Sequence, residues 1–189
     1  MDKSLILLDL SLPGLKLIKR NPISDSRGYL SRLYCKDTLD IAGLTDTIAQ
    51  INITLTKTAG TVRGMHFQHP PFAETKIMTC LRGKIFDVAV DLRKSSSTFL
   101  QWHAEILSPE LNNSIIIPKG FAHGFQSLND NSELLYLHTA PYHPASEGGL
   151  SPLDPILSIH WPLAITSMSD RDKGHALLTD QFKGLLHAM

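Results

Sequence analysis

The sequence predicts an all-β fold, a barrel or sandwich with a few short helices that lie mainly towards the C-terminus. Three observations support this prediction. Short segments rich in apolar and β-branched residues recur along most of the chain, and turn signals separate them at regular intervals. The length of 189 residues, with 42% hydrophobic and 19% charged residues, suits a single domain with a full-sized core. We therefore expect residues 1–189 to form one domain.

The N-terminal part of the chain supplies the first predicted elements. Residues 14–18 have the pattern of a strand, and residues 29–34 follow a turn signal with strand propensity. Residues 36–42 predict one short helix, and residues 48–56 predict a strand rich in β-branched side chains.

Alternation is clearest in residues 84–93, which predict the best-defined strand. The even-numbered positions from 86 to 92 are apolar, whereas Asp87 and Asp91 share the opposite face, a polar interior if the sheet closes into a barrel. A proline-rich loop is predicted at 141–162, and in the tail only residues 172–186 have a helical pattern. The remaining strands are predicted at 75–81, 99–107, 113–117 and 133–139.

Composition excludes several classes of protein. Lysine plus arginine and aspartate plus glutamate both number 18, so the net charge near zero argues against general binding to nucleic acid or to a membrane surface. Cys35 and Cys80 are the only cysteines, too few for a disulfide framework or a cysteine zinc site. The apolar run at 5–8 is too short for a signal peptide or a membrane span. We expect a cytoplasmic protein.

A histidine-containing motif bears on metal binding. Pro118, Gly120 and His123 form a P-x-G-x-x-H pattern that resembles the second sequence motif of cupins, which are small jelly-roll β-barrels. The first motif of a metal-binding cupin needs an H-x-H pair and a glutamate. Here His66 and His69 are three residues apart, and on a strand they would point to opposite faces. Because a four-ligand site lacks donors, the sequence predicts no metal.

Without a metal, a histidine is either a hydrogen-bonded structural residue or a general base. A base needs a pKa near the working pH and a carboxylate that orients the ring. His66 is the candidate base because of the residues around it. We expect structural roles for His69, His103, His143, His160, His175 and His187.

Seven stretches carry a resemblance to a known family. They are R-G-M-H-F-Q (63–68), G-K-I-F-D-V-A-V-D-L-R (83–93), S-x-T-F (96–99), I-P-K-G-F-A-H-G-F (117–125), L-L-Y (134–136), Y-x-P-x-S-E-G-G (142–149) and D-P-x-x-x-I-x-W-P (154–162). From about residue 14 onwards, the chain resembles the dTDP-4-dehydrorhamnose 3,5-epimerase family. The resemblance implies a cupin-like jelly roll and a cofactor-free epimerase of nucleotide-linked 4-keto-6-deoxyhexoses, used in deoxysugar and polysaccharide biosynthesis.

The resemblance also implies a mechanism and its residues. The 4-keto group acidifies the hydrogens on C3 and C5, so the reaction needs a base, an acid across the ring and a charge near O4 for the enolate. His66 corresponds to the base, and Asp172, rather than the nearby Asp170, to its carboxylate partner. Tyr136 corresponds to the acid, and Lys76 to the group that stabilises the enolate.

Substrate-binding positions follow from the same resemblance. Arg63 corresponds to a diphosphate-binding position, and simple alternation would place it opposite His66 unless Gly64 marks a β-bulge. Family members are homodimers that share the nucleotide pocket, so the segment around residues 27–32 is expected to contact the partner's ligand. The further substrate-binding positions are Asp87, His123, Tyr142, Gln50, Asn52, Arg27, Tyr29, Arg32 and Arg171.

Two departures from the family pattern concern the nucleotide base. Arg32 stands where the family carries a glutamate, and Pro141 stands where it carries a stacking aromatic residue. A carboxylate accepts a hydrogen bond from thymine N3–H, whereas an arginine only donates. A CDP-linked or GDP-linked sugar, inverted at C3 or C5 alone, is therefore an alternative substrate. A nucleotide-sugar ketoisomerase and a non-catalytic sugar-binding cupin remain as less favoured alternatives.

Overall fold

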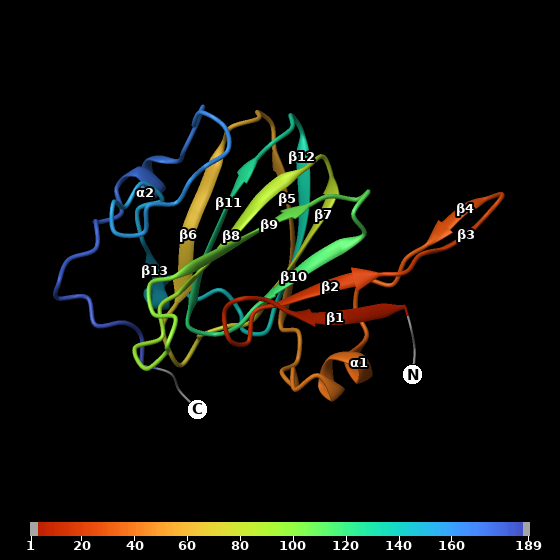
Figure 1. The fold of residues 1–189 in the computed structure, drawn as a ribbon, viewed down its shortest axis with the longest axis horizontal. Coiled ribbons are helices and arrows are strands. Elements are labelled where there is room, and N and C mark those ends of the chain that lie inside the picture. The colour runs from red at the N-terminus through yellow and green to blue at the C-terminus, as the bar shows by residue number, and fades with distance from the viewer. Residues whose placement is uncertain (1–3, 187–189) are drawn as a thin grey trace.

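The computed structural model describes residues 4–186, which form two antiparallel β-sheets packed face to face (Figure 1). The larger sheet has the strand order β1 (Leu5–Asp9), β2 (Lys16–Arg20), β10 (Asn113–Ile117), β7 (Lys76–Arg82), β12 (Ser132–His138) and β5 (Gln50–Thr56). The smaller sheet has the order β13 (Glu147–Gly149), β6 (Val62–Gln68), β11 (Phe121–Ser127), β8 (Ile85–Asp91) and β9 (Trp102–Leu107). The all-β sandwich predicted from the sequence is confirmed.

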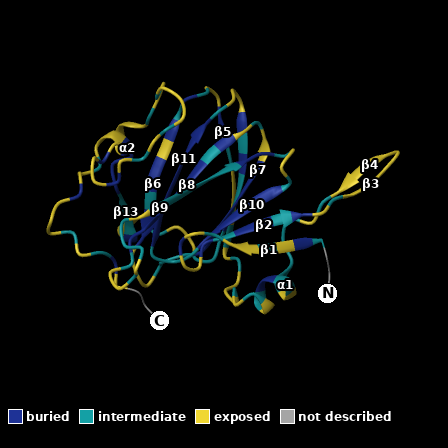
Figure 2. Cartoon of the chain, viewed as in Figure 1, coloured by how far each residue is buried: buried dark blue, intermediate teal, exposed yellow. Residues whose placement is uncertain are grey.

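Three apolar clusters hold these layers together. The first fills the space between the sheets and includes Leu17, Met78 and Leu134 from the larger sheet and Ile85 and Phe125 from the smaller one. A second covers the outer face of the smaller sheet, and a third covers the outer face of the larger sheet. The central strands β8, β10 and β11 are therefore buried on both faces, while the edge strands β1 and β5, the loops and the projecting hairpin are the more exposed parts (Figure 2).

Short helices and one hairpin lie outside the two sheets. The helix predicted at 36–42 is present as α1 (Lys36–Ile41), whose Leu39 packs in the third cluster. A 3-10 turn, η1, spans Pro144–Ser146, and α2 spans Asp170–Lys173. Strands β3 (Ile23–Asp25) and β4 (Gly28–Leu30) form a hairpin that projects from the body (Figure 1). No helix among residues 4–186 is long and apolar enough to cross a membrane.

Several predicted elements need correction. Residues 29–34 do not form a full strand, because β4 ends at Leu30, and the sequence did not predict β1. The helix predicted at 172–186 is wrong, because helical structure in the tail is limited to α2 and ends at Lys173. The tail instead lies against the smaller sheet. Leu178 N–H donates to Asp154 Oδ2, and Leu185 N–H donates to the Leu92 carbonyl at 2.6 Å.

Candidate active site

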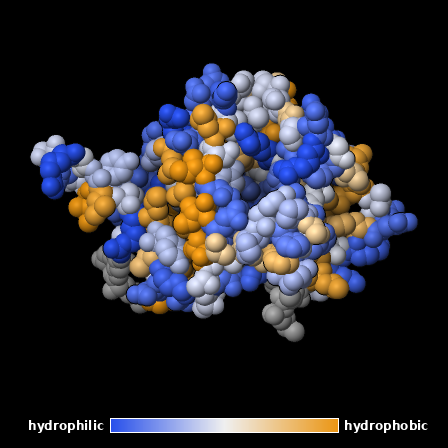
Figure 3. All heavy atoms as spheres, turned by 180° about the vertical axis from the view of Figure 1, so that it is seen from behind, coloured by the Kyte–Doolittle hydropathy of each residue, from blue (hydrophilic) through white to orange (hydrophobic). Residues whose placement is uncertain are grey.

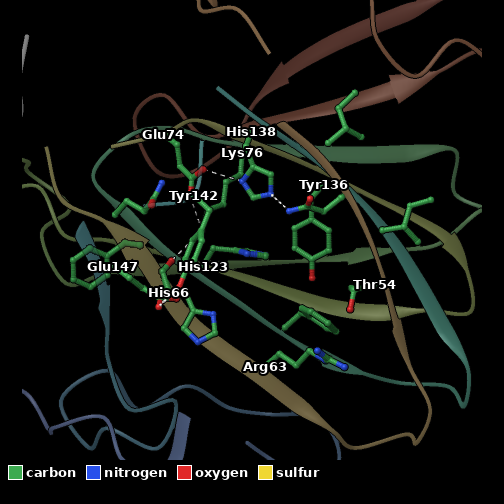
Figure 4. A pocket seen from close by; sticks show the side chains of 16 residues that line it. Thr54, Arg63, His66, Glu74, Lys76, His123, Tyr136, His138, Tyr142 and Glu147 are labelled. Atoms are coloured by element: carbon green, nitrogen blue, oxygen red, sulfur yellow. Dashed lines mark hydrogen bonds and ion pairs between the residues drawn. The ribbon is translucent and has the colours of Figure 1, made fainter. Parts of the chain in front are cut away.

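A cavity of about 580 Å³ opens between the two sheets (Figure 4). Its walls come from β5, β6, β7, β11 and β12, together with the loop that follows β12. The alternation of side chains along each strand sends every second residue into this space. The cavity therefore collects polar side chains that are far apart in the sequence.

A β-bulge at Gly64 places Arg63 and His66 on the same wall. The pairing of β6 with β11 shifts by one residue, since His66 faces His123 while Arg63 faces Phe125. Gly64 has a φ of +136°, and a Cβ there would lie 2.5 Å from the Cα of Gly124. Both side chains line the cavity, as the predicted bulge requires.

The imidazole of His66 pairs with the carboxylate of Asp172. His66 Nε2 lies 2.8 Å from Asp172 Oδ1, and Asp172 Oδ2 accepts from the Gly64 N–H at 3.3 Å. Helix α2 holds the carboxylate in place, because the Ser169 hydroxyl caps it by accepting from the Asp172 N–H. Asp170, the alternative partner, has a fully exposed side chain. The structure thus selects Asp172.

The pKa of Asp172 reflects two opposing effects. Burial alone would raise it, since the residue is only 2% exposed. The hydrogen bond and the charge of His66, with the backbone N–H of Gly64, outweigh burial and lower the pKa to about 2. The carboxylate is therefore ionised at neutral pH and suited to orient and stabilise a protonated His66.

Arg171 and His175 lie beside the His66–Asp172 pair. Arg171 lies with one guanidinium nitrogen 3.2 Å from His66 Nε2 and another 3.0 Å from Glu147 Oε1. His175 packs edge-on against His66, with ring centroids 5.8 Å apart. Among the described residues, His66, Asp172 and His175 form the one group of donors close enough to hold a metal ion. A cation there would have to displace the Arg171 guanidinium, so the group is a poor metal site.

Tyr136 occupies the wall across the cavity from His66 (Figure 4). Burial raises the pKa of its phenol, and the nearby charge of Asp87 raises it further, with Arg63 acting in the opposite direction. The hydroxyl therefore keeps its proton at neutral pH. A protonated hydroxyl facing the cavity is able to serve as a proton donor.

A second imidazole–carboxylate pair lies deeper in the cavity. His123 Nε2 is 2.9 Å from Asp87 Oδ2, and both side chains are buried. These two residues thus satisfy each other, as buried polar groups must. Asp87 Oδ1 is buried and has no hydrogen-bond partner among the described residues. Asp91, on the same face of β8, instead binds Arg93, Ser96 and Thr98 at the far end of the strand.

Lys76 projects into the cavity from β7. Its Nζ lies 3.3 Å from the carbonyl oxygen of His66 and 3.4 Å from Glu74 Oε1. Burial lowers the pKa of this ammonium group, and the negative charge of Glu74 opposes that lowering. A buried cation beside a polar cavity is positioned to stabilise a developing oxyanion.

The rim of the cavity holds three more of the predicted binding residues. Tyr142 N–H donates to Gln50 Oε1 at 3.0 Å, and Gln50 Nε2 donates to Asn52 Oδ1 at 3.2 Å. The Tyr142 hydroxyl donates to Glu147, which also pairs with Arg171. Arg171 therefore closes one side of the rim through Glu147.

Comparison with known proteins identifies the family. The family model described as dTDP-4-dehydrorhamnose 3,5-epimerase matches residues 9–180. The chain belongs to the dTDP-4-dehydrorhamnose 3,5-epimerase family. The dTDP-4-dehydrorhamnose 3,5-epimerase of Sinorhizobium fredii is 38% identical over 177 residues, which cover 90% of this chain and 88% of the relative. That of Salmonella typhimurium is 36% identical and covers 92% and 96%.

Solved structures of epimerases have the same fold. The epimerase of Bacillus anthracis with bound TDP and pyrophosphate superposes with a TM-score of 0.89 at 36% identity, covering 92% of this chain and 99% of that one. The Legionella pneumophila enzyme in complex with dTDP-4-keto-L-rhamnose has a TM-score of 0.90 at 34% identity, with 98% and 100% covered. A 3'-monoepimerase of Streptomyces bikiniensis also matches, with a TM-score of 0.83 at 33% identity and 89% and 85% covered. The sandwich is therefore the cupin-like jelly roll of this epimerase family.

Three predicted binding residues lie away from the cavity of their own chain. Arg27, Tyr29 and Arg32 belong to or follow the β3–β4 hairpin, which projects from the body past β2 (Figure 1), and none of them lines the cavity. Arg27 pairs with Asp25 at 2.5 Å, and Arg32 donates to the Ser4 hydroxyl at 3.2 Å. The epimerase fold thus does not bring this set to its own active site.

The structure also adds residues that the sequence did not single out. Glu74 and Glu147 line the cavity, and so does His138. His138 has a detectable signal, since it follows Tyr136 by two residues on an alternating strand. His175 was expected to be structural, yet it lies beside His66. The other histidines expected to be structural contact residues other than His66: His69 packs against Phe67, His103 bonds Ser11, His143 stacks on Phe72 and His160 packs against Trp102. His187 lies outside the described residues.

Proposed function

We propose that this chain is an isomerase that inverts C3, C5 or both in a nucleoside-diphosphate 4-keto-6-deoxyhexose, with a dTDP-linked sugar as first candidate. The observation that carries the proposal is the placement of the His66–Asp172 pair and the protonated Tyr136 on opposite walls of one cavity. The names of the relatives agree with this reaction. No cofactor is required by the chemistry, because the substrate's own keto group stabilises the carbanion as an enolate.

The proposed reaction starts with proton removal by His66. The ring nitrogen not bound to Asp172 takes the proton from C3 or C5, and Asp172 stabilises the imidazolium. The electron pair moves to O4, where the Lys76 ammonium stabilises the enolate. Tyr136 then donates its hydroxyl proton to the opposite face of the same carbon. Asp87 and His123 would bind the sugar, and Arg63 with Arg171 would bind the diphosphate.

A homodimer with a shared site fits the exposed apolar surface. Strand β5 lies at the edge of the larger sheet and exposes Ile51, Ile53 and Leu55, of which the first two also line the cavity. A column of apolar residues runs over the back of the molecule (Figure 3). We propose that a second copy covers this row. Its β3–β4 hairpin would then bring Arg27, Tyr29 and Arg32 to the nucleotide.

The dimer is testable by mass. Light scattering is expected to give twice the chain mass of 20.9 kDa. Ile53→Lys, which places a charge in the proposed interface, is expected to shift the protein to a monomer. A monomeric wild type would exclude the shared site.

The identity of the nucleotide base in the substrate is a separate question from the reaction. Arg32 donates hydrogen bonds, which suits the acceptors of cytosine better than thymine N3–H. Calorimetry with dTDP, CDP and GDP decides between them. Clear preference for dTDP would exclude the CDP and GDP alternatives, and Arg32→Glu is expected to move any CDP preference towards dTDP.

Solvent exchange tests the activity itself. The enzyme is incubated in D₂O with dTDP-4-keto-6-deoxyglucose, and deuterium at C3 and C5 is followed by NMR. Label at both carbons indicates a 3,5-epimerase and label at one carbon indicates a single-site epimerase. The same incubation is repeated with the CDP-linked and GDP-linked 4-keto sugars. Absence of label with all three substrates would indicate a sugar-binding protein without epimerase activity. With the balanced charge and the two cysteines, we further propose one cytoplasmic domain that does not bind nucleic acid.

A further inference from the structure

Glu74 carries one carboxylate that two cavity residues share. It lies just before β7, and its Oε2 is 2.8 Å from His138 Nδ1. Its Oε1 is 3.4 Å from Lys76 Nζ. All three side chains are nearly buried, with 7%, 13% and 10% exposed for Glu74, His138 and Lys76, and all three line the cavity (Figure 4). Because an ionised carboxylate only accepts hydrogen bonds, Nδ1 of His138 carries the proton.

The imidazole of His138 is held from several sides. It stacks on the Tyr136 ring with centroids 5.9 Å apart and planes 6° apart. Its Nε2 lies 3.4 Å from the Asn52 amide nitrogen. His138 is also the direct strand partner of Lys76, since β12 and β7 pair at these two residues. The carboxylate bound to this fixed ring is itself fixed in position.

The distance of 3.4 Å between Glu74 Oε1 and Lys76 Nζ bears on the charge of the Lys76 side chain. Burial favours the neutral amine of Lys76, and the nearest negative charge that opposes this is Glu74. A charge-assisted contact of about 2.7–2.9 Å would bind the ammonium group firmly to the carboxylate. At 3.4 Å the carboxylate still supports the charge, while the ammonium keeps donors for an oxygen in the cavity.

We propose that Glu74 and His138 are positioning residues for Lys76: His138 holds the Glu74 carboxylate where it keeps Lys76 charged without capturing its ammonium group. This inference rests on the proposed function, in which Lys76 must be protonated to stabilise the enolate. It assigns a task to two cavity residues that the base, the acid and the diphosphate contacts do not use.

Other ionisable groups surround Lys76 and contribute to its titration. They come from every element that faces it and are His66 and Arg63 on β6, Asp87 on β8, His123 on β11, Tyr136 on β12 and Glu147 on β13. The test therefore compares changes at Glu74 and His138 against an otherwise unchanged cavity.

The pH profile of kcat gives opposite signatures for the two residues. Glu74→Gln removes the charge that supports Lys76, so the alkaline limb of the profile is expected to move down by about one pH unit or more. His138→Leu releases the carboxylate, which then moves onto Lys76. Its alkaline limb is expected to move up, and kcat on the plateau is expected to fall about tenfold as the ammonium group is captured.

Matched variants separate this role from a general effect on folding. His138→Asn keeps a donor near the position of Nδ1 and is expected to retain kcat within about threefold. Glu105→Gln removes a carboxylate from a comparable histidine pair on β9, outside the cavity, and is expected to leave the limb unmoved. If Glu74→Gln does not fold, the upward shift in His138→Leu decides alone.

Limbs that stay in place, or that move in the same direction in both variants, would overturn the inference. Failure of the proposed function is distinguishable, because the wild type would then incorporate no deuterium. A wild type that exchanges normally, with unmoved limbs in the variants, would exclude only the role given to Glu74 and His138.

Discussion

Along β7 and β12 the inward-facing side chains change character from one end to the other. At one end Lys76 pairs with His138, and at the other Cys80 pairs with Leu134. The same alternation that places the apolar residues in the core also places the ionisable ones in the cavity. The comparison shows that one pair of strands provides a packed core at one end and a reactive site at the other.

The two ends obey different physical requirements. At the apolar end, close packing removes nonpolar surface from water. At the cavity end, each buried carboxylate has an imidazole partner: Asp87 has His123, Asp172 has His66 and Glu74 has His138. Without such partners the buried charges would be costly. Mutations at the apolar end should therefore lower stability alone, whereas mutations at the cavity end should lower activity and can also leave a buried charge unpaired.

The largest effect is expected at the base. His66→Ala removes the general base and should lower kcat of the folded enzyme about 10³-fold. It should also lower the thermal transition, because the buried Asp172 carboxylate loses its partner. His103→Ala is the control, because His103 lies on β9 and contacts Ser11 and Glu105 rather than the cavity. Deuterium incorporation measures both. Retention of more than about a tenth of the activity in His66→Ala would contradict the assignment.

The apolar end should give the reverse result. Leu134→Ala removes a fully buried side chain and should lower the free energy of unfolding by about 3 kcal/mol, with kcat of the folded enzyme within threefold. Leu153→Ala, at an exposed leucine, should change stability by less than about 0.5 kcal/mol. Urea denaturation measures both. A large loss of kcat in folded Leu134→Ala would show that the two ends are coupled.

A smaller effect is expected from the acid titration of Asp172. Its pKa in the folded state is about 2, below its ordinary value of 3.8, so its contribution is present above pH 4 and is lost as pH falls through 2. Asp172→Asn should therefore remove roughly 2 kcal/mol of acid-dependent stability. Asp170→Asn, at an exposed neighbour, should leave the pH dependence of unfolding unchanged. Equal effects of the two substitutions would contradict the His66–Asp172 pairing.

Sequence patterns correctly predicted the elements whose structure is determined by local residues. The alternation at 84–93 placed Asp87 on the interior face, and Gly64 indicated the bulge that brings Arg63 and His66 together. The tail helix failed because contacts distant in sequence override local propensity. Leu178 and Leu185 make backbone hydrogen bonds to Asp154 and Leu92, and both side chains pack on the sheet.

The contacts that the sequence did not predict are those between residues on paired strands. His138 and Lys76 are 62 positions apart, and only the register of β7 with β12 brings them together through Glu74. The predicted strand at 29–34 was similarly limited by its partner, since β3 offers only three residues for pairing. Such registers are set by the whole fold rather than by one segment.

The most direct test of the cavity end uses Tyr136→Phe in D₂O with the 4-keto sugar. His66 is unchanged, so it should still remove protons and exchange them with solvent, while the opposite face lacks its proton donor. The account predicts deuterium incorporation with retained configuration and at least about a 10²-fold loss of inversion. Inversion at the wild-type rate would contradict the placement of base and acid on opposite walls.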